Sequence, residues 1–346
     1  MLRWSGALHP ILIQIGDFPI HTFGVCVLLA VVLSLSWVRY DAPRVGIDPE
    51  DMVSLGIEVF LAGLVGSRIL FVWHNWDGMY SELPWHAPFN LREGGLIWYG
   101  GLLAATACGY LRARAWKVPV QAACDVMAGG IMLGLATGRV GCLMAGDDHG
   151  RIAADPDAWY TITFTDPNAL LSDSFKNVAL LPAQPAMMLG AFSLFLILIS
   201  VRKKLAHVPS GLACLLFTLY PIHRFLVEFI RGDKIRGHVP QDWFLIGGLS
   251  TSQAISVPVV MIAAGLFVWR VMKFRGAPDP VPLPGWPGNV VSREEREKAA
   301  AAEAKSGKKK PDEKKPKLEL NDDDTSDAET EDSDTKDADR QDSGGS

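Results

Sequence analysis

The chain has 346 residues, of which 49% are hydrophobic, and its mean hydropathy is +0.17 despite a highly charged C-terminal end. The formal net charge of −5 says little about partners, because residues 276–346 carry much of the charge and the rest is apolar. Such a chain, with 11 tryptophans and 15 phenylalanines, is typical of a membrane protein with aromatic anchors at the interface. We predict a polytopic membrane protein and expect no nucleic-acid partner.

Seven apolar segments approach the roughly twenty residues that cross a bilayer. They are 18–38, 52–74, 94–111, 120–144, 184–201, 210–230 and 254–272. The third and fifth are marginal, so six spans is the alternative count. The first is long enough to cross and follows no basic segment, so we expect no cleavable signal peptide. The predicted fold class is an all-α polytopic membrane protein with seven transmembrane helices.

Basic residues favour one orientation of these spans. They follow the first, third, fifth and seventh: Arg39, Arg44, Arg112, Arg114, Lys117, Arg202, Lys203, Lys204, Arg270, Lys273 and Arg275. The connection 145–183 carries only Arg151 and Lys176 against six aspartates. The positive-inside rule then places the N-terminus outside and the C-terminus in the cytoplasm. Seven spans agree with this alternation and six do not.

The chain is expected to divide into a membrane domain, 1–275, and a tail, 276–346. Alternating residues 159–164 predict short strands in a small periplasmic cap over 145–183, and 75–93 is expected to lie at the interface. The tail is rich in proline, lysine and acidic residues and is predicted to be disordered and cytoplasmic. Its lysine cluster, 308–317, leaves open a contact with anionic lipid head groups.

The cysteines predict neither a disulfide framework nor a zinc site. All five lie in apolar stretches, and none forms a C-x-x-C pair: Cys26, Cys108, Cys124, Cys142 and Cys214. There is no phosphate-cradling glycine-rich loop after a strand, and Asp147-Asp148-His149 alone is a weak metal signal. We expect no cofactor and no metal.

Arg139, near the end of the fourth span, is the most informative residue. An arginine in hydrocarbon costs at least a few kcal/mol, so such residues face a polar cavity or an anion. Gly130, Gly134 and Gly138 recur every four residues and predict close packing with a neighbouring helix. Arg139 is therefore expected to point into the protein interior.

The sixth span carries a stripe of charged and polar residues. Tyr220, Arg224 and Glu228 lie four residues apart, with Arg231 about one turn further. A structural Arg–Glu ion pair is one interpretation. The second span adds Arg68, however, and the surplus of arginines favours an anionic partner. Because a guanidinium holds phosphate with two parallel hydrogen bonds, a phospholipid head group is the natural candidate.

Tyr99 lies between two Gly-Gly pairs, 94–95 and 100–101, so that backbone or a lipid chain can approach it closely. A buried tyrosine needs a partner for its hydroxyl. The alternatives are a tyrosine of the interface belt and an acid/base group facing the same cavity as the arginines.

The order of these motifs resembles the prolipoprotein diacylglyceryl transferases of bacteria, over some 260 residues. The resemblance rests on Ile20-His21-Thr22-Phe23-Gly24, Gly66-Ser67-Arg68, Glu93-Gly94-Gly95-Leu96, Tyr99-Gly100-Gly101, Gly138-Arg139-Val140-Gly141-Cys142 to Gly150-Arg151, Leu181-Pro182-Ala183-Gln184, Arg224-Phe225-Leu226-Val227-Glu228-Phe229-Ile230-Arg231 and residues 250–256. The Gly-Arg-x-Gly and Arg-Phe-x-x-Glu-Phe-x-Arg motifs are the most specific of these.

The resemblance implies transfer of the diacylglyceryl group of phosphatidylglycerol to the lipobox cysteine of a prolipoprotein, at the outer face of the bacterial inner membrane. It implies that 1–275 is the transferase domain. Arg139 and Arg231 are then expected to bind phosphatidylglycerol, and Tyr99, Arg224 and Glu228 to be catalytic. Cavity or structural roles fall to Arg68, Gly100, Gly101, Gly138 and Gly141.

The chain departs from the family pattern at several positions. Tyr99 stands where many members have histidine, Cys142 where asparagine is common, and Phe23 where tyrosine is. Ala186 and Met187 replace a Tyr-Glu pair, and Asp147-Asp148-His149 is uncommon. These departures leave open a non-catalytic relative that binds lipid or lipoprotein. An anion transporter is a further alternative, against which the lack of an internal repeat argues.

Overall fold

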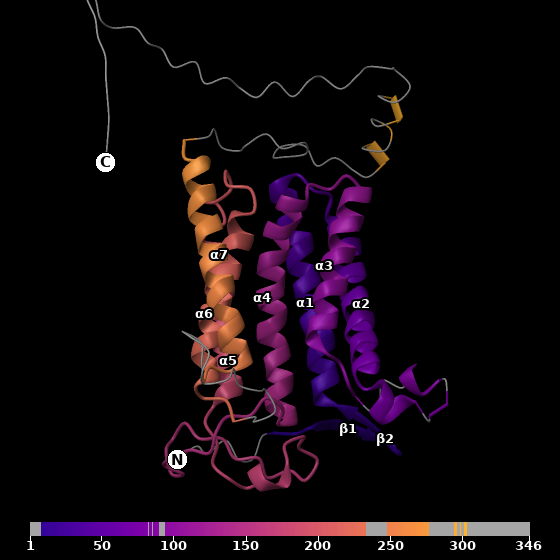
Figure 1. Cartoon of the computed structure of the whole chain (residues 1–346), viewed down its shortest axis with the longest axis vertical. Helices are drawn as coiled ribbons and strands as arrows, with labels where there is room; N and C mark the ends of the chain where they lie inside the picture. The colour runs from indigo at the N-terminus through magenta and orange to yellow at the C-terminus, as the bar shows by residue number, and fades with distance from the viewer. Residues whose placement is uncertain are drawn as a thin grey trace, which may run out of the picture. The chain divides into compact units, whose positions relative to one another are not determined.

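A computed structural model of the chain describes residues 8–81, 83–84, 86–89, 94–232 and 248–276, with 294–295, 298 and 301–302. Two strands and seven helices of 18 to 26 residues make up the body of this part (Figure 1). They are β1 (Ile11–Ile15), β2 (Phe18–His21), α1 (Thr22–Asp41), α2 (Pro49–His74), α3 (Trp98–Ala115), α4 (Val120–Ala145), α5 (Ala183–Val201), α6 (Gly211–Glu228) and α7 (Thr251–Lys273).

Six of the described helices are long and apolar enough to cross a membrane, namely all but α3. This confirms the multi-pass membrane class and six of the seven predicted spans. Helix α3 falls below the same criterion because its 18 residues end with Arg112 and Arg114 in the last turn. It nevertheless runs alongside α2 and α4 between the same two ends of the bundle, and successive helices alternate in direction (Figure 1).

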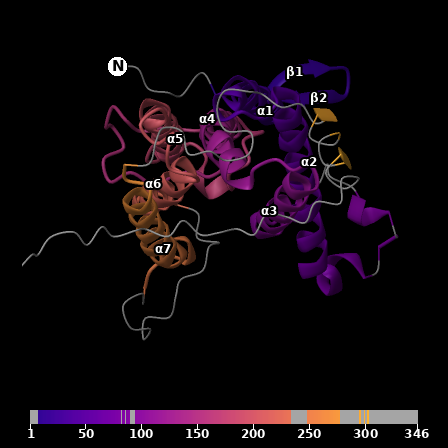
Figure 2. The same cartoon turned by 90° about the horizontal axis from the view of Figure 1, so that it is seen from above.

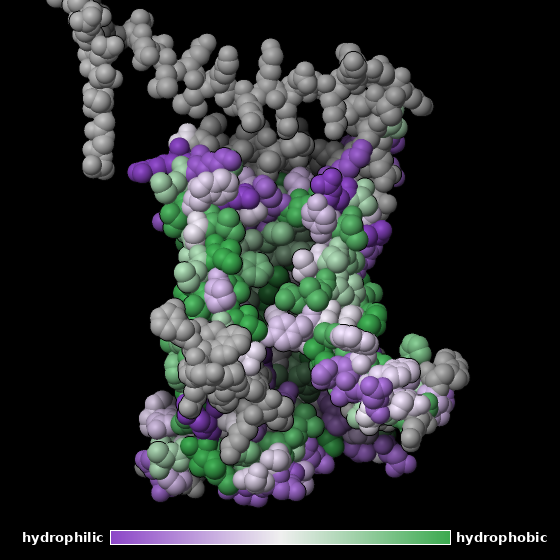
Figure 3. Space-filling view, in the orientation of Figure 1, coloured by the Kyte–Doolittle hydropathy of each residue, from purple (hydrophilic) through white to green (hydrophobic). Residues whose placement is uncertain are grey.

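Helix α4 lies at the centre of the bundle. It packs against α1, α5 and α6, while α2 and α3 pair on one side and α6 and α7 on the other (Figure 2). Apolar side chains cover the middle of the bundle and hydrophilic ones its ends, as expected for a protein solvated by lipid between two aqueous faces (Figure 3). Figure 3 also shows the visible face hollowed between the α6–α7 side and the α2–α3 side.

Glycines bring α4 against α1. A Cβ on Gly134 would lie 3.3 Å from the Cβ of Ser34 in α1, and the Ser34 hydroxyl donates to the Gly130 carbonyl at 2.7 Å. Gly141 continues this contact, because a Cβ there would lie 2.9 Å from Cys26. The predicted stripe through Gly138 was wrong in that position, since a Cβ there would meet nothing within 4 Å. With about 3.6 residues per turn, the residue seven positions along a helix lies closer to the starting face than the residue four positions along. Gly141 therefore continues the seam from Gly134, and Gly138 does not.

A second glycine seam joins α2 to α3. A Cβ on Gly66 or Gly100 would overlap backbone of the opposite helix, and one on Gly101 would overlap the Ser67 hydroxyl. Gly100 and Gly101 are both buried in this contact. Their absent side chains let two backbones approach closely, which is how small residues stabilise helix pairs in lipid.

The N-terminal boundary of the first helix differs from the prediction. The predicted span began at residue 18, but α1 begins at Thr22, and residues 11–21 form an antiparallel hairpin of β1 and β2. Its apolar side chains, including Ile15 and Phe18, are exposed. Gly16 makes the turn with a φ of +58°. An apolar strand followed directly by an apolar helix leaves no composition change to mark the boundary.

The connection 146–182, here called the cap, packs on the end of α4 through an apolar cluster that joins Leu143 of α4 with Ile162, Phe164 and Leu180. The strand predicted over 159–164 was wrong: Ile162 makes an isolated bridge to Leu180, and Trp159 is exposed in a turn. In the described part of 75–93, short helical turns occupy Trp76–Tyr80 and Ala87–Phe89. Glu93 lies outside the described residues, as does most of the predicted tail. Beyond residue 276, the structure describes only 294–295, 298 and 301–302, which are helical.

Candidate functional site

Three charged side chains from distant parts of the chain meet at the end of α4. Arg139 Nη1 contacts Oδ2 of Asp148, and Arg231 Nη2 contacts Oδ1 of the same carboxylate. The side chains of Arg139, Asp148 and Arg231 are 20%, 17% and 2% exposed. Arg139 therefore points into the protein interior as predicted, and its partner is an acid from the following loop.

Backbone pairing fixes this loop against the segment that follows α6. The Arg151 amide donates to the Ile230 carbonyl at 2.9 Å, and the Gly232 amide donates to the His149 carbonyl at 3.0 Å. A Cβ on Gly150 would overlap the Leu181 carbonyl, and one on Gly232 would overlap the Gly150 carbonyl. Only glycine permits this approach, so the two glycines hold Asp148 and Arg231 together.

The turn into the loop requires unusual backbone. Helix α4 ends at Gly146, whose φ of +79° is the left-handed conformation typical of a helix C-cap. Asp148 also has a positive φ, +57°, and its backbone amide donates a hydrogen bond to the Asp147 carboxylate at 2.8 Å. The buried Gln184 amide donates to the Asp147 carbonyl at 2.9 Å. These contacts aim the Asp148 carboxylate back at the end of α4.

The pKa values of the adjacent Asp147 and Asp148 are shifted in opposite directions. Burial alone would raise the pKa of Asp148, but the hydrogen bond from Arg231 and the charges of Arg139 and Arg231 outweigh it and hold that pKa well below its usual range. Burial and the charge of Asp148 raise the pKa of Asp147. Asp148 is therefore ionised at neutral pH and serves as the counter-ion of both arginines.

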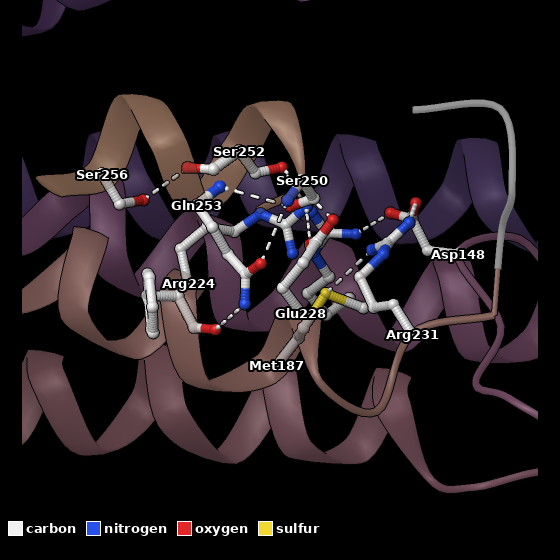
Figure 4. A network of polar contacts seen from close by, with 11 residues as sticks. Asp148, Met187, Arg224, Glu228, Arg231, Ser250, Ser252, Gln253 and Ser256 are labelled. Carbon is white, nitrogen blue, oxygen red and sulfur yellow. Dashed lines mark hydrogen bonds and ion pairs between the residues drawn. The ribbon is translucent and has the colours of Figure 1, made fainter. Parts of the chain in front are cut away.

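Arg224 and Glu228 form a second ion pair next to this cluster (Figure 4). Their Nη2 and Oε2 atoms lie 2.7 Å apart, and the side chains are 15% and 8% exposed. Arg224 also donates to the Ser252 hydroxyl at 3.1 Å, at the start of α7. Ser250 and Gln253 form a capping box there, which fixes the first turn of α7 beside the pair.

The predicted stripe on one helix is correct for Arg224 and Glu228 but wrong for Arg231. Helix α6 ends at Glu228, and Arg231 lies in the segment that pairs with Gly150. Its other terminal nitrogen contacts the Met187 sulfur at 3.3 Å, in the first turns of α5 (Figure 4). The helix ends early because Phe229, Ile230 and Arg231 close it with three-residue turns.

His223 is also close to these arginines. Its ring lies where a side chain on Gly190 of α5 would be, and it hydrogen-bonds the Met187 carbonyl. Arg139 and Arg224 are its charged neighbours. Neither His223 nor Gly190 was predicted as a site residue.

Tyr99 lies elsewhere in the bundle, at the start of α3. The residue is 47% exposed, and its ring meets the Trp98 ring edge-on at 5.4 Å between centroids. The arginine clusters come from α4, α6, α7 and two loops, whereas Tyr99 belongs to the α2–α3 pair. It shares with them the end of the bundle at which α3 begins and α4 ends (Figure 1).

Arg68 holds the connection that precedes α3. It donates to the carbonyls of Pro88 at 2.7 Å and Gly94 at 2.6 Å, and its guanidinium lies over the rings of Phe71 and Tyr80. The side chain is buried. This arrangement agrees with the structural interpretation of Arg68, because its donors are directed at backbone.

Possible metal ligands also occur here. Cys142, Asp147 and Asp148 bring three donor atoms within 4.8 Å of one another. Asp148, however, is already bound by two guanidinium groups, whose positive charges repel a cation. These ion pairs therefore disfavour a metal ion at the three donor atoms.

The sequence named Asp148 only as part of a weak metal signal, and its ion pairs with two arginines were not predicted because it lies outside the predicted spans. The available signal was the uncommon acidic pair Asp147-Asp148 shortly after the predicted span that carries Arg139. Ser252 was also missed as a ligand of Arg224, although its motif, residues 250–256, was noted.

The fold and the site define a polytopic helical membrane protein with a buried arginine–carboxylate centre at one end of its bundle. The family model described as prolipoprotein diacylglyceryl transferase matches residues 10–269, and the chain belongs to this family.

Proteins named phosphatidylglycerol–prolipoprotein diacylglyceryl transferase are similar to most of the chain. That of Pediococcus pentosaceus is 27% identical over 275 residues, covering 78% of this chain and 93% of the relative. Those of Bacillus licheniformis (27% over 275 residues; 78% and 94%) and Gloeobacter violaceus (25% over 259 residues; 75% and 91%) match comparably. These findings confirm the predicted family and identify a bacterial multi-pass membrane protein of a transferase family.

Proposed function

We propose that this protein transfers the diacylglyceryl group of phosphatidylglycerol to the lipobox cysteine of prolipoproteins, the first step of lipoprotein maturation. The observation that carries the proposal is the position of the family's Gly-Arg-x-Gly arginine. Arg139 lies in a buried cluster of arginines and carboxylates, and the family model covers all the residues concerned. Relatives named for this reaction match three quarters or more of the chain.

The reaction breaks the bond between a glyceryl carbon and a phosphate oxygen and forms a bond from that carbon to sulfur. The cysteine loses its proton, and glycerol phosphate leaves with the electron pair of the broken bond. Negative charge grows on the phosphate oxygens as the bond breaks, so preorganised arginines at that point stabilise the transition state. The acceptor protein supplies the thiol, and the enzyme needs no cysteine of its own.

We assign phosphate binding to Arg139 and Arg231, with Arg224 as the arginine that stabilises the leaving group. Arg139 is supported by its partial exposure at the end of α4. Arg231 is almost fully buried behind Asp148 and contributes its positive charge from there. Glu228 holds the Arg224 guanidinium in place through their 2.7 Å ion pair.

Tyr99 is proposed to assist removal of the thiol proton. Its support is the exposure of the residue, 47%, and its place at the same end of the bundle as the arginines. Histidine is the side chain used most often for such proton transfers. The proposed enzyme is therefore slower in this step than relatives with histidine.

The proposed topology places the hairpin, the cap and the arginine clusters on the periplasmic side of the bacterial inner membrane. Its support is the distribution of basic residues: α1, α3 and α7 carry arginine or lysine in their last turns, and all three end at the opposite face (Figure 1). Domain 1–275 would span the membrane seven times, with the tail 276–346 in the cytoplasm. The hollow in Figure 3 is the proposed entry for lipid and signal peptide from the membrane.

The test is expression of the chain in bacteria depleted of their own transferase. We expect prolipoprotein to gain a diacylglyceryl group, seen as a mass increase of the intact lipoprotein, with none in cells that express Arg139→Ala. Unmodified precursor in the presence of well-expressed, membrane-inserted protein would contradict the proposal and favour a lipid-binding relative without activity.

A further inference from the structure

Asp148 joins the two arginines of the site, yet the proposed reaction gives it no role. Arg139 and Arg231 each meet one of its oxygens, through one terminal nitrogen each. A guanidinium binds carboxylate or phosphate best through two parallel hydrogen bonds. Asp148 uses only one terminal nitrogen of Arg139, so it holds this arginine by less than the full interaction.

The two arginines differ in their access to an incoming anion. Arg231 is 2% exposed and is held from the other side by the Met187 sulfur. Arg139 is 20% exposed. An anion that approaches the cluster therefore meets Arg139 first and is attracted to it.

The backbone of Asp148 supports a special role for its side chain. Its φ of +57° lies in the left-handed region, which residues with a Cβ adopt uncommonly, although aspartate tolerates it better than most. Such conformations persist where the surroundings over-determine them, and they cluster at functional sites. Here the Gly146 turn and the Gly150 contact with Leu181 fix the chain on both sides.

We propose that Asp148 is an intramolecular counter-anion, which holds Arg139 and Arg231 together until lipid binds and then yields Arg139 to the phosphate of phosphatidylglycerol. Asp148 stays with the buried Arg231, and Arg139 turns its guanidinium to the phosphate. After transfer, the carboxylate recaptures Arg139 and so helps to release glycerol phosphate. The proposal rests on the function proposed above, and no covalent step is added.

The test is binding of glycerol phosphate to the purified full-length protein, measured by isothermal titration calorimetry. If Asp148 holds Arg139 for nine-tenths of the time, Asp148→Asn is expected to lower the apparent Kd about tenfold, since apparent affinity scales with the competent fraction. Asp148→Gly is expected to do the same and accepts the positive φ without strain. Asp148→Glu keeps the anion and stays within about twofold of the wild-type Kd.

Two control variants separate this effect from a change in net charge. Asp173→Asn removes an exposed acid from the same cap, and Asp41→Asn removes an arginine partner at the other end of the bundle. Both are expected to leave the Kd for glycerol phosphate unchanged. Equal tightening in Asp173→Asn, or no tightening in either Asp148→Asn or Asp148→Gly in protein that remains folded at the assay temperature, would overturn the counter-anion role.

The two proposals fail in different ways. Binding of glycerol phosphate needs no thiol acceptor and no turnover. Wild-type protein that modifies prolipoprotein, with no tightening in the Asp148 variants, refutes the counter-anion and leaves the function standing. Wild-type protein that neither binds glycerol phosphate nor modifies prolipoprotein refutes both.

Discussion

Two aspartates at opposite ends of the bundle each hold two arginines, and they hold them differently. Asp41, the last residue of α1, binds Arg44 through two parallel hydrogen bonds of 2.8 Å and Arg202 through a third of 3.0 Å. Asp148 binds Arg139 and Arg231 through one oxygen each. The Asp41 carboxylate is thus fully engaged, while the Arg139 guanidinium keeps donors for another partner.

Their surroundings differ in the same direction. Asp41 is 2% exposed on helical backbone, and the Arg202 guanidinium lies over the rings of Trp37 and Tyr40, 5.2 and 5.5 Å from their centroids. Asp148 is 17% exposed on a loop with left-handed backbone. Burial of an arginine–carboxylate cluster therefore does not by itself mark a binding site. Unused donors and access from outside distinguish an exchangeable pair from a structural one.

The largest expected effect is on Arg139. Arg139→Ala removes the accessible arginine and should lower the rate of lipid transfer by about 10²–10³, the usual cost of removing a preorganised donor. Arg39→Ala, which removes an exposed arginine paired with Glu50, is the control and should leave the rate unchanged. Mass spectrometry of a lipobox peptide incubated with phosphatidylglycerol measures both. If Arg139→Ala transferred lipid at the wild-type rate, the Asp148 cluster would be a structural ion pair like the Asp41 cluster and not a binding site.

The next effect comes from the loop that carries Asp148. Gly150→Ala forces a Cβ into the Leu181 carbonyl, which displaces the loop from Arg231. Misplacement by about 1 Å can cost a hundredfold in rate, and we expect a loss approaching that size in the same assay. Gly138→Ala is the matched control, because its Cβ meets nothing within 4 Å and the bundle should fold as before. Equal activity of the two variants would show that the loop position is unimportant.

Asp41→Asn should affect stability and not activity. Breaking a buried ion pair costs about 3–5 kcal/mol, and we expect about 2–3 kcal/mol because the two arginines keep some solvent contact. Their side chains are 19% and 18% exposed. Thermal unfolding in detergent should show a Tm lower by several degrees, with an unchanged transfer rate per folded molecule. A loss of activity without a loss of stability would assign Asp41 to the site.

Tyr99 tests whether the α2–α3 side contributes to the reaction. Tyr99→Phe removes the hydroxyl and should slow transfer about tenfold, below the usual 10²–10⁴ of general acid–base catalysis. Tyr99→His should raise the rate. The pH dependence of kcat/KM for both variants measures this. A Tyr99→Phe profile identical with that of the wild type would remove tyrosine from the mechanism.

The smallest expected effect is a difference between Asp147 and Asp148 in how their substitution changes the Tm. The pKa of Asp148 is lowered by folding, so it stabilises the fold above about pH 4 and loses this as the pH falls through its folded pKa. The pKa of Asp147 is raised, so its charged form costs stability at neutral pH. At pH 7, Asp148→Asn should lower the Tm and Asp147→Asn raise it slightly. Tm measured from pH 3 to pH 8 would contradict this if both variants lowered it equally.

Much of the fold could be predicted from local sequence. The predicted span 120–144 became α4, Val120–Ala145, and 184–201 became α5, Ala183–Val201. Apolar length is a property of each segment alone, so its prediction needs no knowledge of neighbours. The hairpin of β1 and β2 was missed because its apolar residues merge with those of α1.

The candidate site could be predicted only in part. The cost of Arg139 and the Arg224–Glu228 spacing are visible in the sequence, because charge within an apolar run and a four-residue interval are local patterns. Which glycine of α4 meets α1 depends on where the partner helix lies, so the contact of Gly141 with α1 became known only from the packing.

By itself, the amino-acid sequence determined a membrane-spanning helical protein, its family motifs and an arginine that requires an anion. Only the tertiary structure decided which anion the protein itself supplies. Asp148 and Arg231 are 83 residues apart, and they meet because Gly150 and Gly232 allow two loops to pair. Electrostatic contacts act over a few ångströms in space regardless of chain separation, so the partner of a buried charge is known only when the chain is folded.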